Sequence, residues 1–133
     1  MIYLPDTNVW IRELNVQPST VQARFRACRP QNILLCDVVK AELYYGAFKS
    51  ARPVDNLSSL AILFGGFESL AFDGAAARVF GKLRADLAVR GTPIGLLDLQ
   101  IASFAMLHGC TLVTNNTKEF SRIIGLNFED WDS

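Results

Sequence analysis

Short apolar or β-branched runs alternate with longer stretches of helical periodicity along almost the whole chain. The short runs predict β-strands at residues 2–4, 33–36, 69–72, 111–114 and 127–128. The longer stretches predict helices at residues 20–28, 38–48, 54–64, 74–89 and 97–108. Because strands that alternate with helices are joined by right-handed crossovers, we expect an α/β fold with a mostly parallel sheet covered on both faces.

The length and composition indicate one domain. The 133 residues contain no internal repeat, low-complexity tract or long linker, so we expect a single domain over 1–133. The N-terminus lacks the features of a secretory signal, and no uncharged apolar stretch reaches the length of about 18 residues that a membrane span requires. Three cysteines without CxxC spacing fit reduced thiols. These features predict a soluble, cytoplasmic protein with no membrane segment.

The charge balance limits how the chain can bind nucleic acid. Its 13 basic and 13 acidic residues cancel, which argues against binding polyanions by bulk charge. Contact with nucleic acid must come from a local basic patch. The candidate side chains are Arg12, Arg24, Arg26, Arg29, Lys82 and Arg84. The apolar content of 50% is high for a small monomer, so we expect a partner to cover part of the surface.

Three acidic residues stand in strongly apolar surroundings. Asp6 directly follows the first apolar run, Glu42 lies in a helix that is apolar on nearly all sides, and Asp98 lies in the first turn of another apolar helix. We therefore expect the Glu42 helix to be largely buried. In parallel sheets, ligands bind beyond the carboxyl ends of the strands, which is where Asp6 falls. Three carboxylates that converge there would suit a hard divalent cation.

Each of these acids also has a purely structural explanation. Asp6 or Thr7 can cap the helix that follows the first strand, and we expect Thr7 to be the cap and to leave Asp6 free. Glu42 can be an ion-paired surface acid. Asp98 can interact favourably with the dipole of its own helix.

The remaining polar residues do not form another type of catalytic site. Asn116 and Glu119 have the spacing of a capping box, which explains both residues about as well as a functional role does. His108 is the only histidine and lies near the end of a predicted helix, so catalysis by a histidine pair is excluded. The sequence has no G-x-S-x-G elbow and no Walker A loop. A phosphatase with Asp6 as nucleophile would require Asp-x-Asp, where this chain has Asp-Thr-Asn.

Several blocks of the chain, taken in order, resemble the PIN-domain ribonucleases and, within them, the VapC toxins of toxin–antitoxin modules. The blocks are MIYLPDTNVWI at 1–11, VVKAELYYGA at 38–47, GTPIG at 91–95 with DLQIA at 98–102, LVTNNTKEF at 112–120 and GLNFEDW at 125–131. The resemblance implies a three-layer α/β/α PIN-like fold. It also implies an endoribonuclease dependent on Mg²⁺ or Mn²⁺ that hydrolyses RNA through metal-activated water, as the toxin of a type II toxin–antitoxin system.

The resemblance further implies roles for individual residues. Asp6 and Asp98 are the implied metal ligands, and Asn116 stands where many PIN domains carry a fourth acid, so the number of metals stays open. The implied catalytic residues are Asp6, Glu42, Asp98 and Asn116, with Thr7 and Thr114 as supporting donors.

The resemblance implies partners as well. These are an RNA substrate, a second copy of the chain in a homodimer, and a cognate antitoxin protein that blocks the acidic site. The alternative is a catalytically weak PIN-like module that binds RNA or a protein through the same pocket.

Overall fold

The computed structural model describes residues 1–15 and 17–132, and its strands pair in parallel. The strands are β1 (Tyr3–Pro5), β2 (Leu34–Cys36), β3 (Glu68–Leu70), β4 (Thr111–Val113) and β5 (Phe128–Glu129). One sheet has the order β1-β4-β5, and β2 pairs with β3. A parallel bridge between Tyr3 and Ile33 joins the two groups. Every described strand pairing is parallel, which confirms the expected sheet.

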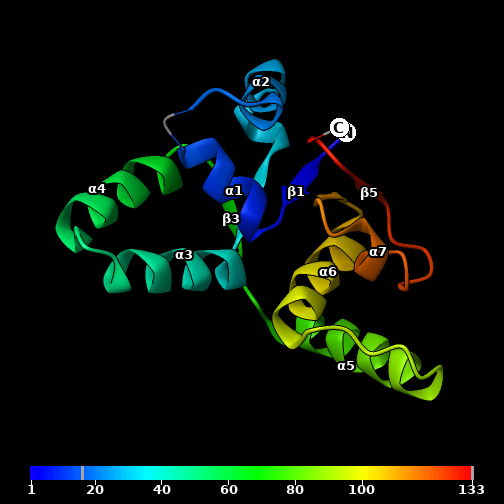
Figure 1. The fold of residues 1–133 in the computed structure, drawn as a ribbon. Coiled ribbons are helices and arrows are strands. Elements are labelled where there is room, and N and C mark those ends of the chain that lie inside the picture. The colour runs from blue at the N-terminus through cyan, green and yellow to red at the C-terminus, as the bar shows by residue number, and fades with distance from the viewer. Residues whose placement is uncertain (16, 133) are drawn as a thin grey trace.

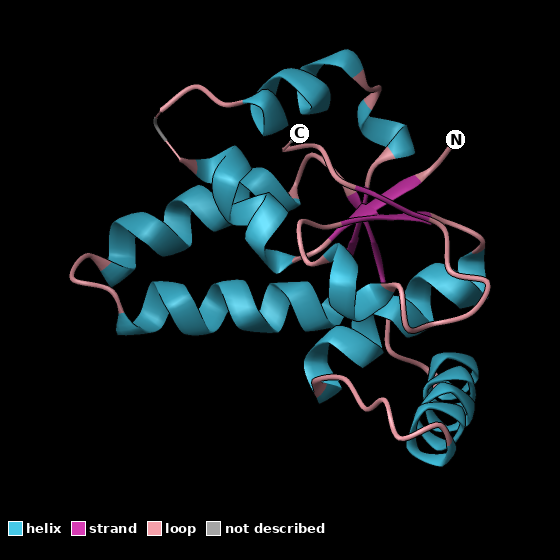
Figure 2. Ribbon diagram, turned by 45° about the vertical axis from the view of Figure 1, so that its right-hand side comes forward, coloured by secondary structure: helices cyan, strands magenta, loops and turns pink. Residues whose placement is uncertain are grey.

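Helices surround the strands, which lie at the centre of the molecule (Figure 2). The helices are α1 (Thr7–Leu14), α2 (Thr20–Ala27), α3 (Asp37–Lys49), α4 (Pro53–Phe64), α5 (Gly74–Val89), α6 (Leu96–His108) and α7 (Thr117–Phe120), with a short 3₁₀ turn at Pro30–Asn32. The five helices expected from periodicity are all present, and α1 and α7 begin at the two places where the sequence offers helix caps, after Asp6 and after Asn116. The result is the predicted helix-rich α/β fold. Among the described residues, we find no helix with the length and apolar character needed to span a membrane.

Aromatic packing holds the N-terminal part of the chain against its C-terminal end. The Trp10 ring of α1 lies 5.0 Å from the Phe25 ring of α2 and 5.0 Å from the Phe67 ring. The Trp131 ring lies 5.1 Å from Tyr3 of β1 and 5.3 Å from Phe25. Both tryptophans are almost completely buried. This cluster fixes β1 and α1, the two elements between which Asp6 lies.

The helices α3 and α4 lie side by side and extend away from the strands (Figure 1). Val39 and Leu43 of α3 are buried, but Tyr45 and Phe48 are each 66% exposed. The expected burial of this helix on nearly all sides is therefore wrong, because its neighbours α1, α4 and α6 leave one face open.

Candidate active site

Asp6 lies at the carboxyl end of β1, where the chain turns into α1. Its backbone N–H donates to the Val113 carbonyl at 2.9 Å, which continues the pairing of β1 with β4. Its side chain is buried, with 4% exposure, and Oδ1 accepts from the Val9 N–H at 3.1 Å. Asp6 is thus the N-cap of α1. The expectation that Thr7 would be the cap is wrong, because the Asp6 carboxylate already reaches the free N–H groups of the first turn.

Thr7 instead connects α1 to α3. Its Oγ1 donates to Oε1 of Glu42 at 2.8 Å. Glu42 is half-buried, and its charge raises the pKa of Asp6. The hydrogen bond therefore brings the second predicted acid to the mouth of the turn that holds the first.

The pKa of Asp6 lies above its usual value, mainly because burial disfavours the charged form. Hydrogen bonds from the Thr114 side chain and the Val9 backbone oppose this rise, and the charge of Glu42 adds to it. A positive charge next to Asp6 would favour its ionised form, and so offset both the cost of its burial and its repulsion by Glu42.

Asp98 approaches the same region from the first turn of α6. Burial and the charges of Glu119, Asp6 and Glu42 raise the pKa of Asp98 to about 6. Three carboxylates from separate parts of the chain therefore act on Asp98. The structure brings the three predicted acids together and adds a fourth.

Glu119 is the residue that sequence reasoning missed. Its Oε1 accepts the Gly95 N–H at 2.8 Å, and its Oε2 accepts from Nδ2 of Asn116 at 2.7 Å. A Cβ built on Gly95 would lie 3.8 Å from Oδ2 of Asp98 and 3.8 Å from Oε1 of Glu119, so the glycine lies beside both carboxylates. Glu119 thus joins the start of α6 to the turn before α7.

Asn116 lies at the start of α7, but the expected capping box is absent. Its side chain makes no capping hydrogen bond to α7 and is directed instead to Glu119. Its backbone N–H donates to Oγ1 of Thr114 at 2.9 Å. Thr114 is completely buried. Its side chain contacts two of the predicted site residues, Asp6 and Asn116.

The oxygen donors of the site suit a hard divalent cation that is held by few protein ligands. The acidic side chains offer oxygen atoms, and the pKa values of Asp6 and Asp98 are both raised, mainly by burial and further by neighbouring negative charge. Among the residues that the structure describes, no group of three or more His, Cys, Asp or Glu side chains is placed to hold an ion together. Mg²⁺ commonly binds through one or two carboxylates and keeps several waters. A two-carboxylate site is therefore the arrangement that these residues fit.

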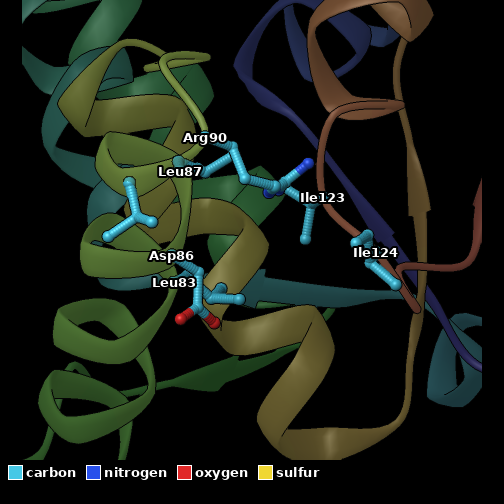
Figure 3. A pocket seen from close by; sticks show the side chains of 7 residues that line it. Leu83, Asp86, Leu87, Arg90, Ile123 and Ile124 are labelled. Carbon is cyan, nitrogen blue, oxygen red and sulfur yellow. The ribbon is translucent and has the colours of Figure 1, made fainter.

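A cavity of about 490 Å³ opens beside the acids, and we call it the Glu42 groove. Its lining residues are Thr7, Asn8, Ile11, Ala41, Glu42, Tyr45, Gly46, Lys49 and Leu97. A different cavity, of about 330 Å³, lies between α5 and the segment 123–124 (Figure 3). None of the candidate acids lines the second cavity. Of these acids only Glu42 lines the Glu42 groove, and Glu42 also lines a neighbouring cavity of about 230 Å³, so the Glu42 groove is the open surface next to the Thr7–Glu42 hydrogen bond.

Three of the predicted basic candidates are engaged in ion pairs within the chain. The pairs are Arg12–Asp132, Arg24–Glu129 and Lys82–Asp86. Arg24 also lies over the Trp131 ring, 5.2 Å from its centroid. These three side chains are therefore already paired with carboxylates of the chain, and a phosphate would have to compete with those carboxylates for them.

Comparison with known proteins gives a consistent result. The family model described as PIN domain matches residues 3–126. The chain is 39% identical over 129 residues to the "tRNA(fMet)-specific endonuclease VapC" of Shigella flexneri, with 97% of each chain covered. It is 39% identical over 133 residues to the "Ribonuclease VapC2" of Rickettsia felis, with 99% of each covered.

Solved structures agree with these relatives. The crystal structure of VapBC2 from Rickettsia felis bound to a DNA fragment from their promoter has a TM-score of 0.91 at 38% identity, covering 99% of this chain and 100% of that chain. The structure of DNA-bound VapBC from Salmonella typhimurium has a TM-score of 0.91 at 37% identity, with 98% of both chains covered.

Proposed function

Because this chain belongs to the PIN-domain family and to the VapC ribonucleases within it, we propose that it is a Mg²⁺- or Mn²⁺-dependent endoribonuclease, the toxin of a type II toxin–antitoxin pair. One observation carries the proposal to individual residues: Asp6 follows β1, Glu42 lies on α3 and Asp98 lies on α6, and the charges of Asp6 and Glu42 add to burial and to the charge of Glu119 in raising the pKa of Asp98. A site that gathers negative charge in this way is suited to hold a cation against an RNA phosphate.

In this proposal Asp6 and Asp98 hold the cation. A bound Mg²⁺ supplies activation of a water molecule and positive charge at the scissile phosphate. The Thr114 and Val9 hydrogen bonds keep the Asp6 carboxylate in one orientation and favour its ionised form. Asp98 is fixed by its place in the first turn of α6.

Glu42 has a different role, because the Thr7 hydroxyl holds one of its oxygens at 2.8 Å. A carboxylate fixed in this way can accept a proton or a hydrogen bond from the attacking water. Thr7 orients Glu42 and does not itself need to contact the RNA. Thr7 and Glu42 would therefore act together, through their hydrogen bond, at the edge of the site.

Glu119 and Asn116 support the site by fixing the backbone around it. Both Glu119 oxygens accept hydrogen bonds, from the Gly95 backbone and from the Asn116 side chain. This bridge holds the start of α6, and therefore Asp98, against the turn that carries Thr114. We assign to Asn116 a contribution through this bridge.

The proposed partners follow from the relatives. Two relatives bear the name tRNA(fMet)-specific endonuclease, so initiator tRNA is the proposed RNA substrate, and its cleavage would take place in the cytoplasm. The solved relatives are VapBC complexes, which supports a cognate antitoxin that covers the acidic site and a homodimer of this chain.

Cleavage of an initiator tRNA transcript by the purified protein tests the proposal. We expect cleavage with Mg²⁺, none with EDTA, and none by Asp98→Asn. Asp86→Asn is the matched control, because Asp86 lies on α5 and pairs with Lys82 outside the site. Cleavage by Asp98→Asn at the wild-type rate would contradict the proposal. RNA binding without cleavage by the wild type would favour the binding-module alternative.

A further inference from the structure

The Glu42 groove contains side chains that the proposed reaction does not use. Along α3, Tyr45 and Gly46 lie three and four residues after Glu42, and Lys49 lies four residues after Tyr45, so the four residues share one face of the helix. All four line the groove. The stripe begins at a candidate acid and ends two helical turns away, at a lysine.

Tyr45 and Lys49 pair with each other on the open surface. The Lys49 Nζ lies 4.7 Å from the centroid of the Tyr45 ring, and the Tyr45 side chain is 66% exposed. Within the described part of the chain, Lys49 has no ion-pair partner, so its charge is available to a ligand.

The neighbouring Tyr44 and Lys40 behave differently although they are on the same helix. The Tyr44 ring lies 5.3 Å from the Phe64 ring of α4, and the Lys40 Nζ lies 5.3 Å from the centroid of that ring. These two side chains thus pack between α3 and α4, while the Tyr45 and Lys49 pair faces the groove.

Gly46 keeps the groove open between these side chains. A Cβ built on Gly46 would meet no atom within 4 Å, so packing does not require glycine there. Glycine inside a helix is destabilising relative to alanine. Its effect at this position is to leave a bare helix surface between Tyr45 and Lys49.

We propose that the Glu42 groove binds an unpaired nucleotide of the RNA next to the cleaved bond, with its base stacked on Tyr45 and a neighbouring phosphate contacting Lys49. The inference rests on the proposed function, since it requires an RNA substrate at the acids. Unpaired bases are recognised by stacking on exposed aromatic rings, and a nearby cation binds the backbone. Lys49 supplies the charge complementary to a phosphate beside a site whose own carboxylates repel phosphate.

Steady-state cleavage of an initiator tRNA transcript tests the base contact. We expect Tyr45→Ala to raise KM by about 5- to 100-fold, as for loss of one stacking platform, with kcat nearly unchanged. Tyr45→Phe should keep the wild-type KM, because it retains the ring. Tyr44→Ala is the matched control and should also keep it.

The proposed phosphate contact of Lys49 and the open surface at Gly46 have separate tests. Lys49→Ala should reduce the slope of log affinity against log salt concentration by about 0.7, the value for one phosphate on a single strand, whereas Lys40→Ala should not. Gly46→Ala should raise Tm, because its methyl group enters open space and favours the helix, yet it should raise KM. A variant with a structural defect would instead have a lower Tm together with a higher KM.

Binding of a fluorescein-labelled unstructured RNA of about 12 nucleotides in EDTA separates this inference from the proposed function. If the wild type binds this RNA through Tyr45 but does not cleave tRNA, the contact between the nucleotide and the groove stands and the nuclease proposal fails. If the wild type cleaves and Tyr45→Ala has the wild-type KM and RNA affinity, the inference is wrong and the nuclease proposal stands. A Tyr45→Ala variant that loses only self-association or antitoxin binding would identify the groove as a protein interface and overturn the inference.

Discussion

Substitution of Asp98 by asparagine should stabilise the metal-free protein at neutral and alkaline pH. Burial and the charges of Glu119, Asp6 and Glu42 raise the pKa of Asp98 to about 6, from 3.8 in the absence of these effects. An acid with a higher pKa in the folded than in the unfolded state stabilises the fold when it is protonated. This contribution is complete below about pH 3.8 and is lost as the pH rises through about 6. Above that pH, ionised Asp98 opposes folding.

The size of the effect follows from the same shift in pKa. A rise from 3.8 to about 6 would correspond to roughly 3 kcal/mol of folding free energy if none of it were screened. Asp98 is only half-buried, so solvent screening should reduce this to about 1 to 1.5 kcal/mol. For a chain of 133 residues, we expect a rise in Tm of about 3 to 7 °C.

Thermal unfolding followed by circular dichroism in EDTA provides the assay. The gain in Tm of Asp98→Asn over the wild type should be present at about pH 8 and should shrink as the pH falls through about 6. Asp37→Asn is the control, because Asp37 also lies in the first turn of a helix but is exposed. An Asp98→Asn variant that is less stable than the wild type at about pH 8, or whose gain does not depend on pH, would refute the reasoning.

Three further substitutions test the surroundings of the site and the core. Thr7→Val removes the hydrogen bond that orients half-buried Glu42 and should lower kcat about tenfold, whereas Thr7→Ser should keep most of the activity, as single-turnover cleavage can show. Glu119→Leu removes both acceptors of the bridge and should lower kcat, whereas Glu119→Gln should keep most of it, because an amide can still accept the Gly95 N–H and pair with the Asn116 amide; an unchanged kcat in Glu119→Leu would contradict the bridge. Trp131→Ala should cost about 3 to 5 kcal/mol in urea unfolding, and a cost below about 1 kcal/mol would contradict the role of the aromatic cluster.

The sequence was sufficient to predict the fold and to select the three candidate acids for the site, because both rest on local signals. Alternating strand and helix patterns determine a parallel sheet, and its carboxyl edge determines where Asp6 lies. Glu42 and Asp98 were found because each is an acid among apolar residues, and the structure places both within reach of the Asp6 charge.

The sequence could not resolve details that depend on contacts between distant residues. Both Asp6 and Thr7 are good capping types, and only the contact of Thr7 with Glu42, 35 residues away, decides between them. Glu119 was explained by its spacing from Asn116 as a capping box, whereas its partner Gly95 is 24 residues away. The exposure of Tyr45 depends on how far α1 and α4 cover α3, which an almost wholly apolar helix sequence does not reveal.

Analysis of the RNA ends tests the central claim most directly, because water and the ribose 2′-hydroxyl leave different products. The purified wild type would cleave an initiator tRNA transcript in Mg²⁺, and mass spectrometry would identify the termini. The site gathers carboxylates and lacks a histidine pair, since the only histidine, His108, lies exposed at the end of α6. We therefore expect 5′-phosphate and 3′-hydroxyl ends, produced by attack of water. Products with 2′,3′-cyclic phosphate ends would contradict it.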